Sequence, residues 1–273
     1  MGGKYQSCKV SIDGCKIRYL DIHNPENSLH NSNTLLMLHG IGASAERWNN
    51  VIAPLSKYYR LIIPDIIGFG LSDKPRLNYT NEFFVNFLKK FLDTLNLGKI
   101  CIMGSSFGGH VAIEYAINFI SSIKKLLLVS PAGIMRSLTP VLTRYINAAL
   151  YPTYQNVSNS FREMTYNPEN VSEDTIKSFI HRMNMPDSKY AFLSTLNGIK
   201  NSKSLKGRLS NITVPTLIIW GENDQVIPIR YLHYFREIPK VQYVTIDRCG
   251  HTPYVEKPIT FSKIVLKFLL NHK

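Results

Sequence analysis

The stretch from Ile100 to Gly109, Ile-Cys-Ile-Met-Gly-Ser-Ser-Phe-Gly-Gly, constrains this chain more than any other segment. The apolar run at residues 99–103 predicts a buried strand, and apolar residues then recur at three- and four-residue steps up to Ile120, which predicts a helix. Between the two lies the pattern G-x-S-x-G, centred on Ser106. A sharp turn that holds a serine in a strained conformation has room for it only if glycines stand two residues before and after.

Strand, tight turn and helix are the context that makes this motif a nucleophile elbow, with Ser106 as the candidate nucleophile. The turn places the hydroxyl at the carboxyl end of the sheet, where the N-terminus of the next helix favours a developing negative charge. Ser105 does not fit, because Met103 would then occupy a position that needs a small residue. The alternative is a glycine-rich turn without chemistry, since short motifs of this kind are loose.

The rest of the chain alternates strands with helices, which predicts a mostly parallel sheet with helices on both faces. A hairpin turns at Asp13-Gly14, and residues 24–33 form a polar loop. Further strands are predicted at 34–38, 60–64, 125–129, 216–221 and 242–246, and further helices at 48–55, 82–95, 228–238 and 258–270. At 273 residues the chain is long enough for one sizeable core with an inserted subdomain.

The pattern changes between Arg136 and Lys206, where buried strands stop and polar helices rich in Tyr, Phe and Met take over. We interpret residues 136–206 as a helical cap inserted between two parts of a core domain, residues 1–135 and 207–273. The cap aromatics are expected to serve packing more often than substrate contact.

Several classes of partner are disfavoured by composition. The net charge is +13, yet the lysines are spread along the chain and no basic run is interleaved with aromatics, so no nucleic-acid partner is expected. No window approaches the ~18 uninterrupted apolar residues of a membrane span, so stable membrane insertion is not expected either. The four cysteines lack metal-type spacing, and we predict neither a metal nor a cofactor.

The compartment expected from the sequence is the cytoplasm. The first nine residues lack the apolar stretch of a signal peptide, and Gln6 breaks the myristoylation pattern. Cys8 and Cys15 could face each other across the hairpin, but free thiols are expected in a reducing compartment. The sequence leaves the oligomeric state open between monomer and homodimer.

Nucleophilic catalysis by a serine needs a base within hydrogen-bond reach and a carboxylate that orients the base. His251 follows the last predicted strand in Asp-Arg-Cys-Gly-His-Thr-Pro, and it is the candidate base. Asp224 follows the next-to-last strand and is the candidate orienting acid, while its rival Glu222 lies too close to the strand end. Asp224 could instead merely cap the helix predicted from residue 228.

The order Ser106, Asp224, His251 is the chain order of the α/β-hydrolases, and the sequence resembles that superfamily over nearly its whole length outside the cap. Five segments carry the resemblance: His39-Gly40, residues 64–72, Gly104–Gly109, residues 221–224, and Gly250-His251. The resemblance implies an eight-stranded, mostly parallel sheet. It also implies that Ser106 attacks a carbonyl, that His251 relays its proton, and that Asp224 fixes the imidazole tautomer.

The same resemblance assigns the oxyanion hole to the backbone N–H groups of Ile41 and Phe107. His39 is expected to brace the glycine loop that follows it by hydrogen bonds. Asp65 is expected to brace the loop that carries Gly68 and Gly70. Neither side chain is expected to take part in the chemistry.

Three functions follow from these residues. A serine at the elbow, rather than an aspartate, favours hydrolysis of small carboxylic esters of short to medium acyl chain. The alternative is a carbon–carbon bond hydrolase of the meta-cleavage-product type, whose elbow resembles Ser106-Phe-Gly-Gly and whose acidic substrate could be held by the cap arginines Arg144, Arg162 or Arg182. In that group a tryptophan commonly follows the catalytic histidine, where this chain has Thr252. A ligand-binding receptor with slow turnover is the third possibility.

Overall fold

The computed structural model describes residues 7–23, 33–135 and 137–271. Within these residues eight strands form one sheet in the order β1-β2-β4-β3-β5-β6-β7-β8. The strands are β1 (Ser7–Ile12), β2 (Cys15–Ile22), β3 (Thr34–Leu38), β4 (Arg60–Pro64), β5 (Ile100–Ser105), β6 (Ile123–Val129), β7 (Thr216–Gly221) and β8 (Val241–Ile246). β1 and β2 pair antiparallel at one edge, and the remaining strands run parallel from β4 to β8. The predicted eight-stranded, mostly parallel sheet is therefore confirmed.

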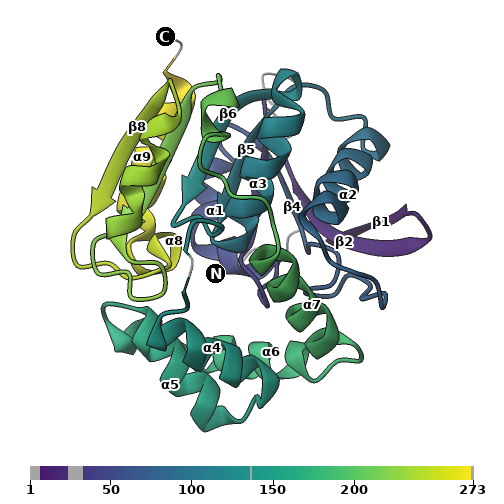
Figure 1. Cartoon of the computed structure of the whole chain (residues 1–273), viewed down its shortest axis with the longest axis vertical. Helices are drawn as coiled ribbons and strands as arrows, with labels where there is room; N and C mark the ends of the chain where they lie inside the picture. Colours follow the sequence, from purple (N-terminus) through teal and green to yellow (C-terminus); the bar gives the residue numbers. More distant parts are fainter. Residues whose placement is uncertain (1–6, 24–32, 136, 272–273) are drawn as a thin grey trace.

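Helices cover both faces of the sheet (Figure 1). The structure contains α1 (Asn49–Leu55), α2 (Asn81–Thr94), α3 (Phe107–Asn118), α4 (Pro140–Leu150), α5 (Tyr154–Met164), α6 (Glu173–Met183), α7 (Ser188–Lys200), α8 (Pro253–Glu256) and α9 (Pro258–Leu270). Short 3₁₀ helices are η2 (Ala45–Trp48), η3 (Ile120–Ser122), η4 (Pro168–Asn170), η5 (Leu209–Asn211) and η6 (Ile229–Glu237). α2 and α3 pack together on one face, and α1, α8 and α9 pack together on the other.

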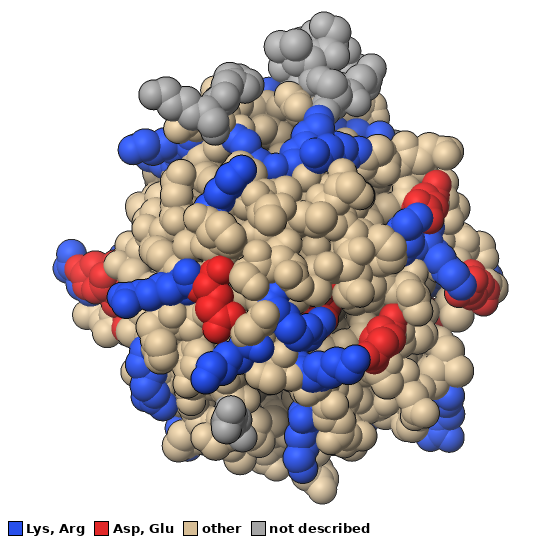
Figure 2. Space-filling view, turned by 45° about the horizontal axis from the view of Figure 1, so that its top comes forward, with Lys and Arg blue, Asp and Glu red and all other residues tan. Residues whose placement is uncertain are grey.

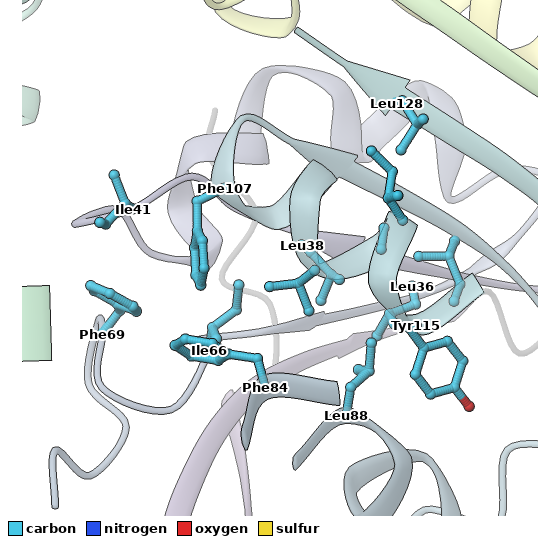
Figure 3. Close-up of a cluster of buried hydrophobic side chains, with 14 of the residues drawn as sticks. Leu36, Leu38, Ile41, Ile66, Phe69, Phe84, Leu88, Phe107, Tyr115 and Leu128 are labelled. Atoms are coloured by element: carbon cyan, nitrogen blue, oxygen red, sulfur yellow. The ribbon is translucent and has the colours of Figure 1, made fainter. Parts of the chain in front are cut away.

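The parallel strands are apolar on both faces because helices bury both. In β3, Leu36 and Leu38 belong to the cluster that contains α2 and α3, whereas Leu35 and Met37 belong to the cluster that contains α1 and α9. Figure 3 shows the first cluster, in which Phe107 lies between Phe69 and Phe84. Its ring centroid is 5.7 Å from that of Phe69 and 4.8 Å from that of Phe84. The beginning of α3 is thus anchored in the core by a large side chain.

Helices α4 to α7, which we call the cap helices, lie together at one end of the molecule, beyond the strand ends (Figure 1). Three of them begin at a threonine or serine whose side chain accepts a hydrogen bond from the backbone N–H three residues on. The capping residues are Thr139 for α4, Thr153 for α5 and Ser172 for α6. These caps satisfy backbone N–H groups that a helix leaves without an internal partner. The domain limits proposed from the sequence, 136 and 206, remain a prediction.

Most predicted elements appear within one or two residues of their expected bounds. The hairpin turns at Asp13 and Gly14, which both have positive φ, at 50° and 81°. The helix predicted over 228–238 is instead the 3₁₀ helix η6. The predicted polar loop at 24–33 lies outside the described residues except for Asn33.

Basic side chains are scattered over the face shown in Figure 2 and are mixed with acidic ones. They do not merge into one continuous basic patch on that face. Among the described helices, none combines the length and apolar character needed to cross a membrane.

Candidate active site

Ser106 lies on the turn between β5 and α3, with φ 52° and ψ −117°. Its backbone N–H donates to the Val129 carbonyl at 2.9 Å, which ties the turn to the end of β6. A Cβ added to Gly104 would lie 2.2 Å from the Gly108 carbonyl oxygen, and one added to Gly108 would lie 2.4 Å from the Leu38 carbonyl oxygen. Both glycines of the motif are therefore required by close backbone approach, as the sequence predicts.

His251 and Asp224 come together at the carboxyl ends of β8 and β7. The Nδ1 atom of His251 is 2.8 Å from Oδ2 of Asp224, and both side chains are buried. The other carboxylate oxygen of Asp224 accepts hydrogen bonds from the N–H groups of Val226 and Ile227, at 2.8 and 2.9 Å. Asp224 thus organises its own turn and lies where it can orient the imidazole. The alternative interpretation is wrong, because η6 begins after Pro228 without a side-chain cap and Asp224 bonds to N–H groups that precede it. Glu222 is exposed and accepts from the Thr245 hydroxyl instead.

A second buried carboxylate, Glu256 of α8, holds the loop that carries His251. Its Oε2 accepts from Gly250 N–H at 2.9 Å and from Tyr166 N–H at 2.8 Å, and its Oε1 accepts from Thr252 N–H at 3.2 Å. Carboxylates that accept from several backbone N–H groups form charge-assisted hydrogen bonds. Because Tyr166 follows α5, Glu256 joins the histidine loop to the cap helices.

The loop after β3 fixes the direction of the Ile41 N–H. The Gly40 carbonyl accepts from His39 Nδ1–H at 2.8 Å and from Ala43 N–H at 3.2 Å. In a trans peptide the next N–H points opposite to the carbonyl, so these bonds direct the Ile41 N–H away from them. His39 Nε2 accepts from Ile66 N–H at 3.0 Å, and burial lowers the pKa of this neutral ring. His39 braces the loop as predicted.

A cap residue also touches this loop. The hydroxyl of Tyr145 in α4 donates to the Ile41 carbonyl at 2.6 Å, and burial raises the pKa of that hydroxyl. A Cβ on Gly42 would lie 3.0 Å from the same hydroxyl oxygen, and Gly42 has φ 71°. The second proposed oxyanion donor, the N–H of Phe107, is the first of α3 and has no partner within that helix.

Asp65 braces the neighbouring loop. Its carboxylate accepts from Ala45 N–H at 2.7 Å and from Leu71 N–H at 2.8 Å, and it lies 3.3 Å from the Arg18 guanidinium. A Cβ on Gly70 would lie 2.2 Å from the Asp65 carboxyl carbon, so that position needs glycine. Asp65 does not line the cavity at Ser106, which agrees with a structural role.

Ser106 and His251 line the same cavity, between the strand ends and the cap helices. Its walls are formed by Gly40, Ile41, Ala43, Arg47, Ser105, Leu142, Tyr145, Phe161, Met164, Thr165, Asn170, Val171, Thr175, Phe179, Arg182, Val226, Thr252, Tyr254 and Val255. Most of this lining is apolar or aromatic, as in typical small-molecule sites. Several of the cap aromatics therefore pack together and face the cavity as well.

Two arginines stand out in this lining, whereas Asp and Glu are absent from its described residues. Arg182 of α6 is half-buried, and its Nε atom has no hydrogen-bond partner. Burial lowers the pKa of the Arg182 guanidinium. Arg47 of η2 is half-buried as well, and its guanidinium lies 6.0 Å from the centre of the Phe161 ring. In the parts of the chain that the structure describes, neither makes an ion pair with a carboxylate. The site therefore presents positive charge to a ligand.

The three arginines singled out in the cap differ in position. Arg144 is exposed and pairs with Glu163, and Arg162 is exposed. Of the three, Arg182 lines the cavity with Ser106. Of the three candidates, Arg182 is therefore the one that a ligand beside Ser106 could reach.

His110, one turn into α3, is buried beside the elbow. Its Nε2 is 2.9 Å from Oδ1 of Asn81, while its Nδ1 has no partner. The amide nitrogen of Asn81 faces Glu114, so Oδ1 must accept and Nε2 must carry the proton of a neutral ring. Burial lowers the pKa of His110 to about 4.

This pKa predicts a loss of stability in acid. Between pH 6.5 and 4 the unfolded chain binds a proton at His110 that the folded chain does not, so the free energy of unfolding falls as the pH falls. A shift of this size corresponds to roughly 3 kcal/mol. Urea titrations at pH 7 and pH 4.5 should show a smaller pH effect in His110→Gln than in the wild type. An equal pH effect in both proteins would contradict the prediction.

A family profile for the alpha/beta hydrolase fold matches residues 33–258. The chain belongs to the α/β-hydrolase family. Among curated relatives, this α/β-hydrolase is 31% identical over 252 residues to a 2-hydroxy-6-oxononadienedioate/2-hydroxy-6-oxononatrienedioate hydrolase of Cupriavidus pinatubonensis, covering 87% of each chain. It is 26% identical over 268 residues to a 2-hydroxy-6-oxo-6-(2'-aminophenyl)hexa-2,4-dienoic acid hydrolase of Metapseudomonas resinovorans, covering 95% of this chain and 89% of the relative.

Solved structures agree with this membership. A meta-cleavage product hydrolase from Pseudomonas fluorescens superposes with a TM-score of 0.87 at 26% identity, covering 96% of this chain and 97% of the other. A putative lipase from Acinetobacter baumannii superposes with a TM-score of 0.85 at 25% identity, covering 97% and 91%. The α/β-hydrolase fold and the resemblance to the meta-cleavage-product branch are thereby confirmed.

Sequence reasoning missed Arg47, Glu256 and the particular role of Tyr145. Glu256 carried a usable signal, since it is a lone acid between the candidate histidine and an apolar helix. Arg47 and Tyr145 gave no local signal, because their significance depends on contacts across the cavity.

Proposed function

We propose that this α/β-hydrolase cleaves a carbon–carbon bond in 2-hydroxy-6-oxo-dienoic acids, with Ser106 as nucleophile, His251 as base and Asp224 as its orienting acid. The main support is the charge of the cavity, where Arg182 offers an unpaired guanidinium to an acidic substrate. A partly buried charge that makes no ion pair gains from a hydrogen-bonded partner of opposite sign. A substrate carboxylate would supply the missing partner, with two parallel hydrogen bonds to the guanidinium. The names of the relatives support the same substrate class.

The chemistry suits the triad. Ser106 Oγ would attack the C6 ketone while His251 takes its proton, and the N–H groups of Ile41 and Phe107 would hold the oxyanion. The bond between C6 and C5 can break in the 2-oxo tautomer, which forms when the proton of the 2-hydroxyl group moves to C5. Collapse then breaks this bond, and the electron pair passes through the C3–C4 double bond to the C2 carbonyl. That fragment then takes up a proton, and water releases the acyl group from Ser106. Arg182 would hold the carboxylate of the departing fragment and stabilise its added negative charge.

This proposal reverses the order of the two activities expected from the sequence. Ester hydrolysis remains the second candidate, because Thr252 follows His251 where the carbon–carbon hydrolases commonly have tryptophan. The mostly apolar lining of the cavity would also suit a neutral ester. Both activities share the acyl-enzyme, so a direct comparison of substrates separates them.

The test is a comparison of 2-hydroxy-6-oxo-2,4-heptadienoate with p-nitrophenyl butyrate as substrates. We expect a higher kcat/KM for the dienoate, with kcat of order 1 per second or more. Arg182→Gln should lower kcat/KM for the dienoate by roughly 30-fold or more, because the loss of one partner of a buried charge pair costs about 2–5 kcal/mol. The loss for the neutral ester should be much smaller.

Arg162→Gln is the matched control, because it removes an exposed cap arginine outside the cavity. It should leave the ratio of the two activities as in the wild type. A faster ester reaction, with the dienoate left intact, would favour the esterase. Stoichiometric binding without turnover of either compound would favour the receptor.

We also propose a cytoplasmic location. All four cysteines are free thiols, which suits a reducing compartment.

Cys249 is packed rather than reactive, since it is buried and its pKa is raised by that burial.

A further inference from the structure

Two hydrogen bonds of opposite direction join the loop that carries His251 to the cap helices. The His251 N–H donates to the carbonyl of Met164, the last residue of α5, at 2.9 Å. The Tyr166 N–H donates in return to Oε2 of Glu256 at 2.8 Å. A Cβ on Gly250 would lie 2.4 Å from the Met164 carbonyl oxygen, so the two backbones come as close as a glycine permits. The candidate base is therefore bonded to the cap through its own main chain.

Glu256 stands at the centre of this contact, and its side chain is buried. Besides the Tyr166 N–H, the carboxylate accepts from the N–H groups of Gly250, at 2.9 Å, and Thr252, at 3.2 Å. These two residues precede and follow His251. A buried N–H group that loses its partner is costly, so the three donors must stay near the carboxylate. One side chain thus fixes both neighbours of the base and the cap segment beside them.

Asp224 and Glu256 act on different parts of His251. Asp224 lies 2.8 Å from Nδ1 of the ring and can set the direction of the imidazole. Glu256 bonds to the main chain on both sides of the residue and can set where the imidazole begins. Efficient proton transfer from Ser106 requires both, because a general base has to lie within hydrogen-bond reach of the proton it takes.

The cap segment bonded to Glu256 also faces the cavity. Met164 and Thr165 line the cavity together with Ser106, whereas the Tyr166 side chain is exposed. A ligand that packs against α5 therefore touches the residues that directly precede the N–H group held by Glu256. Occupancy of the cavity and the position of the base depend on the same short segment.

We propose that Glu256 is a positioning residue, which aligns His251 with Ser106 only while residues 164–166 of the cap rest against the histidine loop. When this segment moves away, the carboxylate loses one of its donors and the His251 N–H loses its acceptor, so the base loses its alignment. Glu256 does not line the cavity, and it acts through His251 alone. The inference rests on His251 as the base of the proposed function, and it holds for whichever bond is cleaved.

Glu256→Gln tests the role of the carboxylate, because the amide has the same shape and one acceptor fewer. With p-nitrophenyl butyrate we expect kcat to fall by about 10- to 100-fold, since a displacement of about 1 Å can cost 10² in rate. KM should change by less than about twofold, because Glu256 makes no contact with the substrate. Glu237→Gln is the matched control. Its carboxylate also accepts from a backbone N–H, that of Gly207 at 2.7 Å, but away from the cavity, so kcat should stay at the wild-type value.

The same substitution in a His251→Ala background separates positioning from a general structural role. Residues that act as a unit give effects that do not add. We expect Glu256→Gln to change the small residual kcat of His251→Ala by less than about twofold, since no base is left to align. Melting temperatures of all variants, with kinetics measured well below them, establish that the folded proteins are compared.

Tyr166→Pro tests the link to the cap, because it deletes the N–H that donates to Glu256. The preceding Thr165 has extended backbone, with φ −108° and ψ 150°, which a following proline requires. We expect kcat to fall by about 10-fold. Tyr166→Ala keeps the N–H and removes only the exposed side chain, so it should retain nearly full kcat.

The outcomes distinguish this inference from the proposed function. Unchanged kcat in His251→Ala would overturn the triad itself. If that activity is lost as expected, full kcat in Glu256→Gln, or an equal loss in both backgrounds, would overturn the role of Glu256 and leave the triad standing. Full kcat in a folded Tyr166→Pro would overturn the coupling to the cap. The Glu256 and Tyr166 variants are independent, so either set decides if a variant of the other does not fold.

Discussion

Ser106→Ala should lower kcat by about 10⁶, the loss seen when the serine of a comparable triad is removed. The fold should survive, because the Ser106 side chain makes no capping hydrogen bond to α3 and alanine keeps the same Cβ in the same backbone conformation. Steady-state turnover of the preferred substrate and the melting temperature measure the two effects separately.

Ser105→Ala is the matched control for this variant, because it removes the same atom one residue earlier. Its hydroxyl faces Tyr254, so the nucleophile stays in place. A fluorophosphonate should label the wild type and Ser105→Ala but not Ser106→Ala, and peptide mapping should place the label on residues 103–109. Substantial activity or labelling in Ser106→Ala would mean that another residue is the nucleophile.

Asp224→Asn should lower kcat by about 10⁴, as in other serine hydrolases in which the buried acid becomes an amide. The amide oxygen can still accept from the N–H groups of Val226 and Ile227, so the turn should stay intact. Its NH₂ group would then face Nδ1 of His251 and donate to it. The proton of the ring would move to Nε2, and the imidazole could no longer act as a base toward Ser106.

Kinetics and stability together test this assignment. The melting temperature of Asp224→Asn should stay near that of the wild type while kcat falls. Glu222→Gln, which changes the exposed rival acid, should retain nearly full activity. Near-normal turnover in Asp224→Asn would show that this carboxylate does not orient the base.

The parallel strands could be predicted from the sequence because helices cover both faces of the sheet. Segments such as 34–38 and 216–221 then have to be apolar throughout, and such runs are easily recognised. The 3₁₀ geometry of η6 could not be predicted, since the two helix types give similar apolar spacing over nine residues.

The candidate triad could be placed from the sequence because parallel strands all end at the same edge of the sheet. Residues that follow β5, β7 and β8 therefore meet there, however far apart they are in the chain. The cavity charges could not be placed in this way. Whether Arg144, Arg162 or Arg182 faces Ser106 depends on how α4 to α6 pack, which local patterns do not reveal.

The sequence places ester hydrolysis first for the same reason, whereas the cavity and the relatives favour the carbon–carbon hydrolase that we propose. The sequence draws attention to Thr252, next to the candidate base, where the carbon–carbon hydrolases commonly differ. The observation that favours the carbon–carbon hydrolase is Arg182, which makes no ion pair and lies about 70 residues before Thr252 in the chain. Its importance becomes clear only in the structure, where α6 places it in the cavity that Ser106 lines.

The hydrogen bond from Tyr145 to the Ile41 carbonyl has a consequence for the timing of the reaction. If α4 moves outward to admit a substrate, this bond breaks, and the loop that carries the proposed oxyanion donor of Ile41 loses its contact with the cap helices. Attack by Ser106 would then be efficient only after α4 has returned over the bound substrate and the bond from Tyr145 to Ile41 has formed again. The intermediate would thus form only in a closed cavity, where the cap helices separate it from bulk solvent.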